Sequence, residues 1–163
     1  MNRITLLEQL KEDTDKAVKN LIMPVRVQSA SEEQQYRAAD VYLMRLSDSS
    51  AAKKKAPYII HQVITGKDSQ QRGSRADSTV TVRSIFCVYN DDEQEGGLML
   101  LNLMERLRIY LLQRVVIGGK YQLNLEAGLE TLIYPNESAP YYVGEMVSTW
   151  DMPSVEREVM KCL

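Results

Sequence analysis

The sequence contains few of the residues from which catalytic and metal sites are usually built. Its 163 residues include one histidine, His61, and two cysteines, Cys87 and Cys162. Two cysteines so far apart exclude a disulfide framework and a four-ligand zinc site, so we expect both thiols to be reduced. Because His61 stands in a β-branched run without carboxylates at ligand spacing, we predict a structural role for it, and no metal or other cofactor.

Long apolar runs and an excess of positive charge are also missing. No run approaches the roughly 18 apolar residues of a membrane helix, and the first residues lack a signal-peptide core, so we expect a cytosolic protein without membrane contact. The net charge of −2 leaves no basic excess to release counterions, so no specific nucleic-acid partner is expected. A chain of this length with 44% apolar residues predicts one globular domain over 1–163.

Glycine and acidic motifs do not complete a catalytic site. Gly118-Gly119-Lys120 fails as a phosphate-binding loop, because Arg114 stands where a glycine is required and Tyr121 where Ser or Thr is required. No Gly-x-Ser-x-Gly elbow is found. The acidic residues over 91–95 are interpreted as a helix start rather than a cation site. The sequence therefore predicts that the protein is not an enzyme.

Apolar periodicity predicts two helices. The first covers 3–22 and is ended by Pro24, and the second covers 92–113, with Asp91 and Asp92 as its cap. The buried stripe of the second helix is expected to consist of Leu100, Leu101, Met104, Leu107 and Leu111.

β-branched runs predict a long hairpin over 57–89. Alternation in its second strand predicts that one face buries Val80, Val82, Phe86 and Val88. The segment 66–77 between the two strands has no large apolar residue, so it is predicted to be a mobile loop.

Shorter strands are expected at 25–27 and 39–46 and over the C-terminal region 121–153, with a polar loop at 47–55. In the last strand Tyr142, Met146 and Trp150 point one way and two valines the other, so one face should lie under the helices and the other could meet another subunit. We predict an α+β fold, with a mixed or antiparallel β-sheet flanked by two α-helices.

The order of several motifs resembles a known family. Asp91-Asp92 is followed by the helix segment 101–108, then by Gly118-Gly119-Lys120, and finally by Trp150-Asp-Met-Pro153 and Glu156-Arg157-Glu158. This order, together with the hairpin, is similar to that of the tail terminator (tail completion) proteins of long-tailed bacteriophages and prophages.

The resemblance implies a virion structural protein. Six copies would form a ring on the head-proximal end of the tail tube, end tube polymerisation and provide a face for head docking. It implies as partners other copies of this chain, the tail tube protein and a head–tail connector protein. It places the protein in the bacterial host cytoplasm during assembly and then in the virion tail.

Partner contacts are predicted at two places. Lys67, Arg72 and Arg75 are expected to contact a partner from the hairpin loop, and Tyr142, Met146 and Trp150 are expected at a subunit interface. Alternatives stay open at this point: a head–tail connector or minor tail protein, a non-enzymatic host protein-binding module, or a metal-dependent nuclease using Asp91, Asp92 or Glu130.

Overall fold

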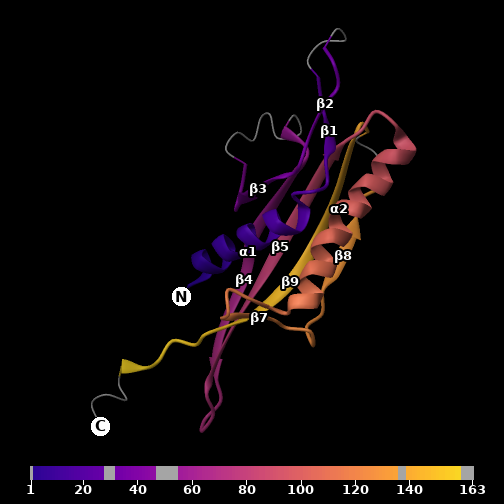
Figure 1. The fold of residues 1–163 in the computed structure, drawn as a ribbon. Coiled ribbons are helices and arrows are strands. Elements are labelled where there is room, and N and C mark those ends of the chain that lie inside the picture. Colours follow the sequence, from indigo (N-terminus) through magenta and orange to yellow (C-terminus); the bar gives the residue numbers. More distant parts are fainter. Residues whose placement is uncertain (1, 28–31, 47–54, 136–138, 159–163) are drawn as a thin grey trace.

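The computed structural model describes residues 2–27, 32–46, 55–135 and 139–158 and confirms the α+β prediction. A curled sheet carries two helices on one of its faces (Figure 1). In chain order the elements are α1 (Arg3–Val18), β1 (Met23–Val25), β2 (Gln35–Arg37), β3 (Asp40–Leu43), β4 (Tyr58–Gln70), β5 (Ala76–Tyr89), α2 (Glu93–Arg114), β6 (Val116–Ile117), β7 (Tyr121–Leu123), β8 (Glu130–Ile133) and β9 (Tyr141–Met152).

The main sheet has seven strands in the order β3-β4-β5-β9-β7-β6, and β8 pairs with another part of β9. β3 and β4 are parallel, and the other pairs are antiparallel. Its centre is the long β5–β9 ladder, which runs from Ser78 opposite Met152 to Tyr89 opposite Tyr141. β1 and β2 form a separate two-stranded unit, and β2 was not predicted. Most of the predicted loop at 47–55 lies outside the described residues.

α1 is shorter than predicted. Asn2 caps it by accepting the Thr5 backbone N–H at 3.0 Å, while the Asn2 N–H donates to the Thr5 hydroxyl at 2.9 Å. The helix ends at Val18, so the prediction of helix to residue 22 is wrong. The chain turns early because Met23, which is fully buried, has to enter the core. Met23 also precedes Pro24, and the α conformation is disfavoured for a residue before a proline.

α2 is capped by one of the two predicted residues, Asp92. The Asp92 side chain accepts the backbone N–H groups of Gln94 and Glu95 at 2.9 and 3.3 Å. One member of the predicted buried stripe is wrong, because Leu101 is 42% exposed and Leu103 is fully buried instead. Leu103 lies three residues after Leu100 and four before Leu107, which keeps it on the stripe that faces the sheet.

The β4–β5 hairpin is longer and more regular than predicted. Strand pairing continues from Gly66 opposite Val80 to Gln70 opposite Ala76, so only 71–75 form the turn and the predicted irregular loop over 66–77 is wrong. The backbone ladder needs no apolar side chains, and a lack of them was the basis of the loop prediction. The hairpin therefore extends beyond the helices as a two-stranded ribbon (Figure 1).

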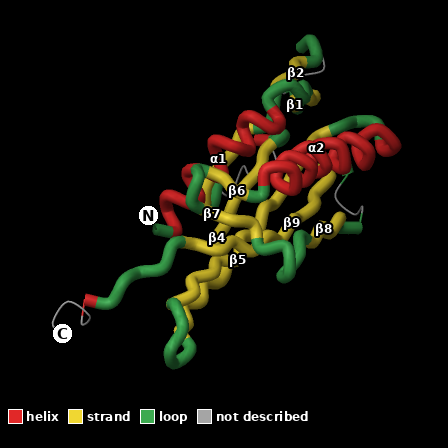
Figure 2. The backbone as a smooth tube through the Cα atoms, turned by 60° about the horizontal axis from the view of Figure 1, so that its bottom comes forward, coloured by secondary structure: helices red, strands yellow, loops and turns green. Residues whose placement is uncertain are grey.

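The main core lies between the helices and one face of the sheet (Figure 2). The predicted alternation in β5 is confirmed, since Val80, Val82, Phe86 and Val88 are all fully buried on the helix side. Neither of the two described helices covers the opposite face, which we call the open face.

Candidate functional site

The β4–β5 ribbon carries the three predicted contact residues on its surface, Lys67 near its base and Arg72 and Arg75 in its turn. Lys67, Arg72 and Arg75 are all exposed, and none of them forms an ion pair with another described residue. The turn closes through a hydrogen bond from the Ser74 N–H to the Gln71 carbonyl at 3.0 Å. Gly73 has φ +81°, a conformation that glycine adopts without steric cost. The turn of the ribbon thus presents two cations, Arg72 and Arg75, that form no ion pair with a described residue.

The base of this ribbon is fixed to the N-terminus of α1. The Arg3 guanidinium donates to the Asp68 carboxylate at 3.2 Å, and the Ser78 hydroxyl donates to the same carboxylate at 2.6 Å. The Arg3 side chain also lies directly over Gly66, where a Cβ atom would overlap it. These contacts set the direction in which the ribbon leaves the body.

The other three predicted interface residues lie in the core. Tyr142, Met146 and Trp150 are at most 4% exposed, and the Trp150 Nε1–H donates to the Ser148 hydroxyl at 2.9 Å. The interface prediction for these three side chains is therefore wrong, because the helices of the same chain already cover them. Their shared face was predicted correctly, but it is the helix side of the sheet.

The open face has its own apolar cluster at one end. Leu46 and Ala56 pack there against strand side chains, which include Tyr58, Ile60 and Cys87. Burial is the main cause that raises the pKa of Tyr58. Two further tyrosines, Tyr89 and Tyr141, complete this cluster, with ring centroids 5.6 Å apart.

The remainder of the open face combines polar and apolar side chains, some half-buried and some exposed. Arg83 donates through Nε and Nη2 to the Gln62 amide oxygen at 3.3 and 3.1 Å. The Tyr134 hydroxyl donates to the Glu145 carboxylate at 2.7 Å, and this hydrogen bond raises the pKa of Tyr134. Leu132 lies beside them and is half exposed. A mixed surface of this kind suits a protein contact better than a small-molecule pocket.

His61 is a buried structural residue. Its Nε2 lies 2.8 Å from the Thr14 hydroxyl and its Nδ1 lies 2.7 Å from the Ser84 hydroxyl. Because Thr14 donates its own proton to the Leu10 carbonyl at 2.6 Å, it accepts from His61, so the proton is assigned to Nε2 and Ser84 donates to Nδ1. Burial lowers the pKa of His61 to about 3, which keeps the ring neutral.

The acidic residues before α2 are used locally. Asp92 is the helix cap, and Asp91 accepts the Tyr89 hydroxyl at 2.7 Å. Within the described part of the chain no three histidine, cysteine, aspartate or glutamate residues lie close enough together to hold a metal ion. Glu130, a candidate ligand, lies on β8, in a different element from this cluster.

Two features of the surface were missed by the sequence reasoning. The first is the segment 153–158, which we call the C-terminal arm, where Val155 is 83% exposed. The second is a shallow groove on β8 and β9 lined by Glu130, Thr131, Leu132, Glu145 and Val147. A strand in this part of the region 121–153 was predicted, but its pairing with β9 is not visible in the sequence.

Comparisons with known proteins add no family assignment. No protein-family model matches the chain, and no curated protein matches it. Among the residues that the structure describes, no helix has the length and apolar character needed to cross a membrane.

Proposed function

We propose that this protein is a phage tail terminator, a structural protein that caps the head-proximal end of the tail tube as a ring of six copies. In this role it ends tube polymerisation and offers a docking face to the head–tail connector. The proposal starts from the order of sequence motifs over 91–158 and from the hairpin, because these features carry the resemblance.

The projecting β4–β5 ribbon is the structural observation that supports the proposal most. A segment that leaves the subunit body can reach a tube on which the ring is placed, and the ribbon extends beyond both helices (Figure 1). Its turn carries Arg72 and Arg75, whose charges are not neutralised by described residues. Arginine is enriched in protein interfaces, so these side chains are the proposed tube contacts.

The open face supports self-association as a second feature. A sheet that carries helices on only one side leaves its other side and its edge strands available to neighbouring subunits. Cyclic rings need heterologous contacts, in which two different surfaces of the same chain meet. The elongated subunit has such different surfaces on its two sides (Figure 2).

The test combines molar mass with tube capping. Light scattering over a wide concentration range and electron microscopy should show a closed six-membered ring, and the purified protein should bind the ends of tail tubes and stop their growth. The double variant Arg72→Ser/Arg75→Ser should keep the fold and the ring but lose capping. Lys19→Ser/Lys120→Ser removes two exposed cations elsewhere and should cap normally.

Capping that survives the loss of both arginines would reject the assigned contact. A chain that forms no complex with tail tubes of any source tested, in spite of correct folding, would reject the terminator function itself.

A further inference from the structure

The groove on β8 and β9 lies along a free edge of the sheet. β8 pairs with β9 on one side, and no described strand pairs with its other side. The Tyr134 N–H donates to the Val143 carbonyl, which fixes the alternation of this ladder and turns the N–H and C=O groups of Thr131 outward. Unpaired groups at a sheet edge are a template for a further strand.

The groove is also acidic and partly apolar. It has a volume of about 360 Å³, and Leu132 on its floor is 51% exposed. Neither Glu130 nor Glu145 forms an ion pair with a described residue, and the nearby Arg83 is hydrogen-bonded to Gln62 instead. The site would accept an extended segment that combines an aliphatic side chain with a cation.

The C-terminal arm has this character. Residues 153–157 have no regular secondary structure, and every second side chain gives the series Pro153, Val155, Arg157. Val155 is 83% exposed, and Arg157 has no ion-pair partner within the described residues. In an extended strand Val155 and Arg157 would point to the same side.

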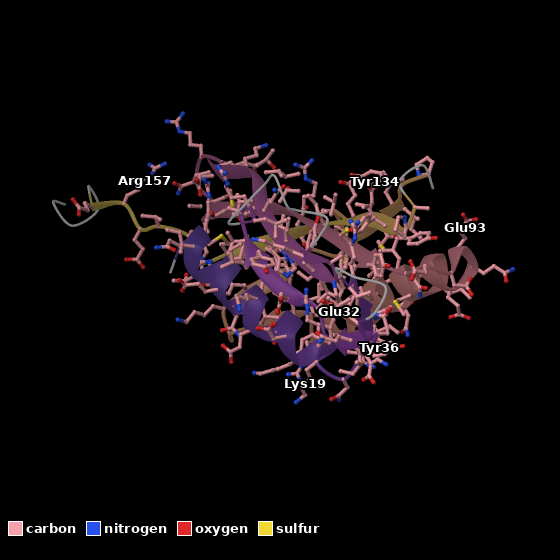
Figure 3. The ribbon with its side chains drawn as sticks, turned by 90° about the horizontal axis from the view of Figure 1, so that it is seen from above. Lys19, Glu32, Tyr36, Glu93, Tyr134 and Arg157 are labelled. Carbon is pink, nitrogen blue, oxygen red and sulfur yellow. The ribbon has the colours of Figure 1, made fainter. Side chains whose placement is uncertain are left out.

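The arm and the groove lie on opposite sides of one subunit. The arm leaves the body on one side and β8 lies on the other in both ribbon and tube views (Figures 1 and 2). Seen from above, Arg157 is near one end of the molecule and Tyr134, the residue after β8, is toward the other (Figure 3). This arrangement separates the arm from its own groove and suits a contact with the groove of the next copy.

We propose that the C-terminal arm of one copy binds β8 of the next copy as an additional antiparallel strand. In this register Val155 lies opposite Leu132, and Arg157 lies opposite Glu130. The contact is heterologous, as a closed ring requires, and it uses backbone pairing for affinity and alternate side chains for specificity. The inference deepens the proposed function and rests on its self-association.

The charge pair is tested in the full-length protein by sedimentation velocity. Glu130→Arg and Arg157→Glu should each raise the concentration needed for association by about tenfold or more, because like charges then face each other. The double variant Glu130→Arg/Arg157→Glu should recover a substantial part of the loss. Glu126→Arg and Lys120→Glu reverse exposed charges outside the groove and should associate like the unchanged protein.

The backbone contact is tested at Thr131. Thr131→Pro removes the outward N–H without removing a bond to β9, whereas Thr131→Ala keeps that N–H. We expect Thr131→Pro to be monomeric at concentrations at which Thr131→Ala associates normally. Circular dichroism melts of both variants establish that the difference does not come from unfolding.

Cross-linking identifies the two surfaces directly. Leu132→Cys and Val155→Cys are made in separate chains, both with Cys162→Ser, and the two are mixed and oxidised. A disulfide-linked heterodimer is expected for this mixture and not for a mixture of Glu126→Cys with Val155→Cys. Absence of the heterodimer, or a free protein that stays monomeric at all concentrations, overturns the inference.

These results are distinguishable from failure of the proposed function. A ring that needs the arm but does not bind tail tubes would keep this contact and reject the terminator role. If Arg157→Glu and Thr131→Pro still formed an unchanged ring and capped tubes, the arm contact would be rejected and the terminator role would be kept.

Discussion

Acid should destabilise the folded protein through His61. The loss of stability should begin at pH values well above about 3, the pKa of the buried ring. The ring is fully buried, and both its nitrogens are engaged by Thr14 and Ser84. Its pKa is lowered from 6.5 to about 3, so the unfolded chain binds a proton between these values and the folded chain does not. Stability is therefore complete above pH 6.5 and is lost as the pH falls toward about 3.

The size of the effect follows from the same two pKa values. Each pH unit in this window costs ~1.4 kcal/mol, which gives about 2 kcal/mol between pH 6.5 and about pH 5 and roughly 5 kcal/mol over the whole window. His61→Gln is the matched variant, because its amide can donate to Thr14 and accept from Ser84 but does not titrate. His61 is the only histidine, so no other imidazole contributes.

The assay is urea unfolding of both proteins at one protein concentration and at several pH values from about 7 to about 4.5. The glutamine variant should start less stable, and the difference should shrink by about 2 kcal/mol as the pH falls to about 5. Nuclear magnetic resonance of the folded protein should show an imidazole signal that does not titrate over this range. Parallel stability curves for the two proteins would refute the reasoning.

Three further predictions concern α2. Gly96→Ala should destabilise the protein by about 1–3 kcal/mol, because a Cβ atom there overlaps the buried Tyr142 ring. Gly97 has open space around it, so Gly97→Ala should stabilise the helix by up to ~1 kcal/mol. Thermal melts distinguish the two variants. Asp92→Ala should cost about 1 kcal/mol in urea unfolding, through loss of the cap. Leu103→Ala should cost about 2–5 kcal/mol and Leu101→Ala less than about 1, and equal losses would contradict the burial pattern.

Local patterns in the sequence predicted those parts of the fold that depend on interactions between residues close together in the chain. The alternation through Val80 and Phe86 and the cap at Asp92 depend on neighbouring residues, and both predictions are confirmed. The segment 66–77 depends instead on distant partners. Its Asp68 is paired with Arg3, 65 positions away, and its backbone is paired across the hairpin, so composition alone indicated a loop where there is a ribbon.

The surfaces were harder to predict for a related reason. Alternation in β9 showed that Tyr142 and Trp150 share a face, but which face the helices cover depends on how the whole sheet is arranged. The groove depends on Glu130 and Leu132 from β8 lying opposite Val147 and Glu145 from β9, a pairing between strands separated by a loop. Lys67 could be placed on the surface from the sequence, because a charged residue in a polar segment has no reason to be buried.

The two proposed contacts act in different directions and should therefore be separable. The ribbon projects past the lower end of the subunit and the arm leaves the body beside it, whereas the β8 edge that would receive a neighbouring arm lies on the opposite side (Figure 1). Lateral contacts would close the ring, and the ribbon would bind the tube below it. Replacing Arg72 should then abolish capping while the ring persists, and replacing Arg157 should weaken the ring first and capping only as a consequence. If both substitutions had the same effect on ring formation and on capping, one surface would have to make both contacts. The assignment of ring closure to the arm and β8 and of tube binding to the ribbon would then be wrong.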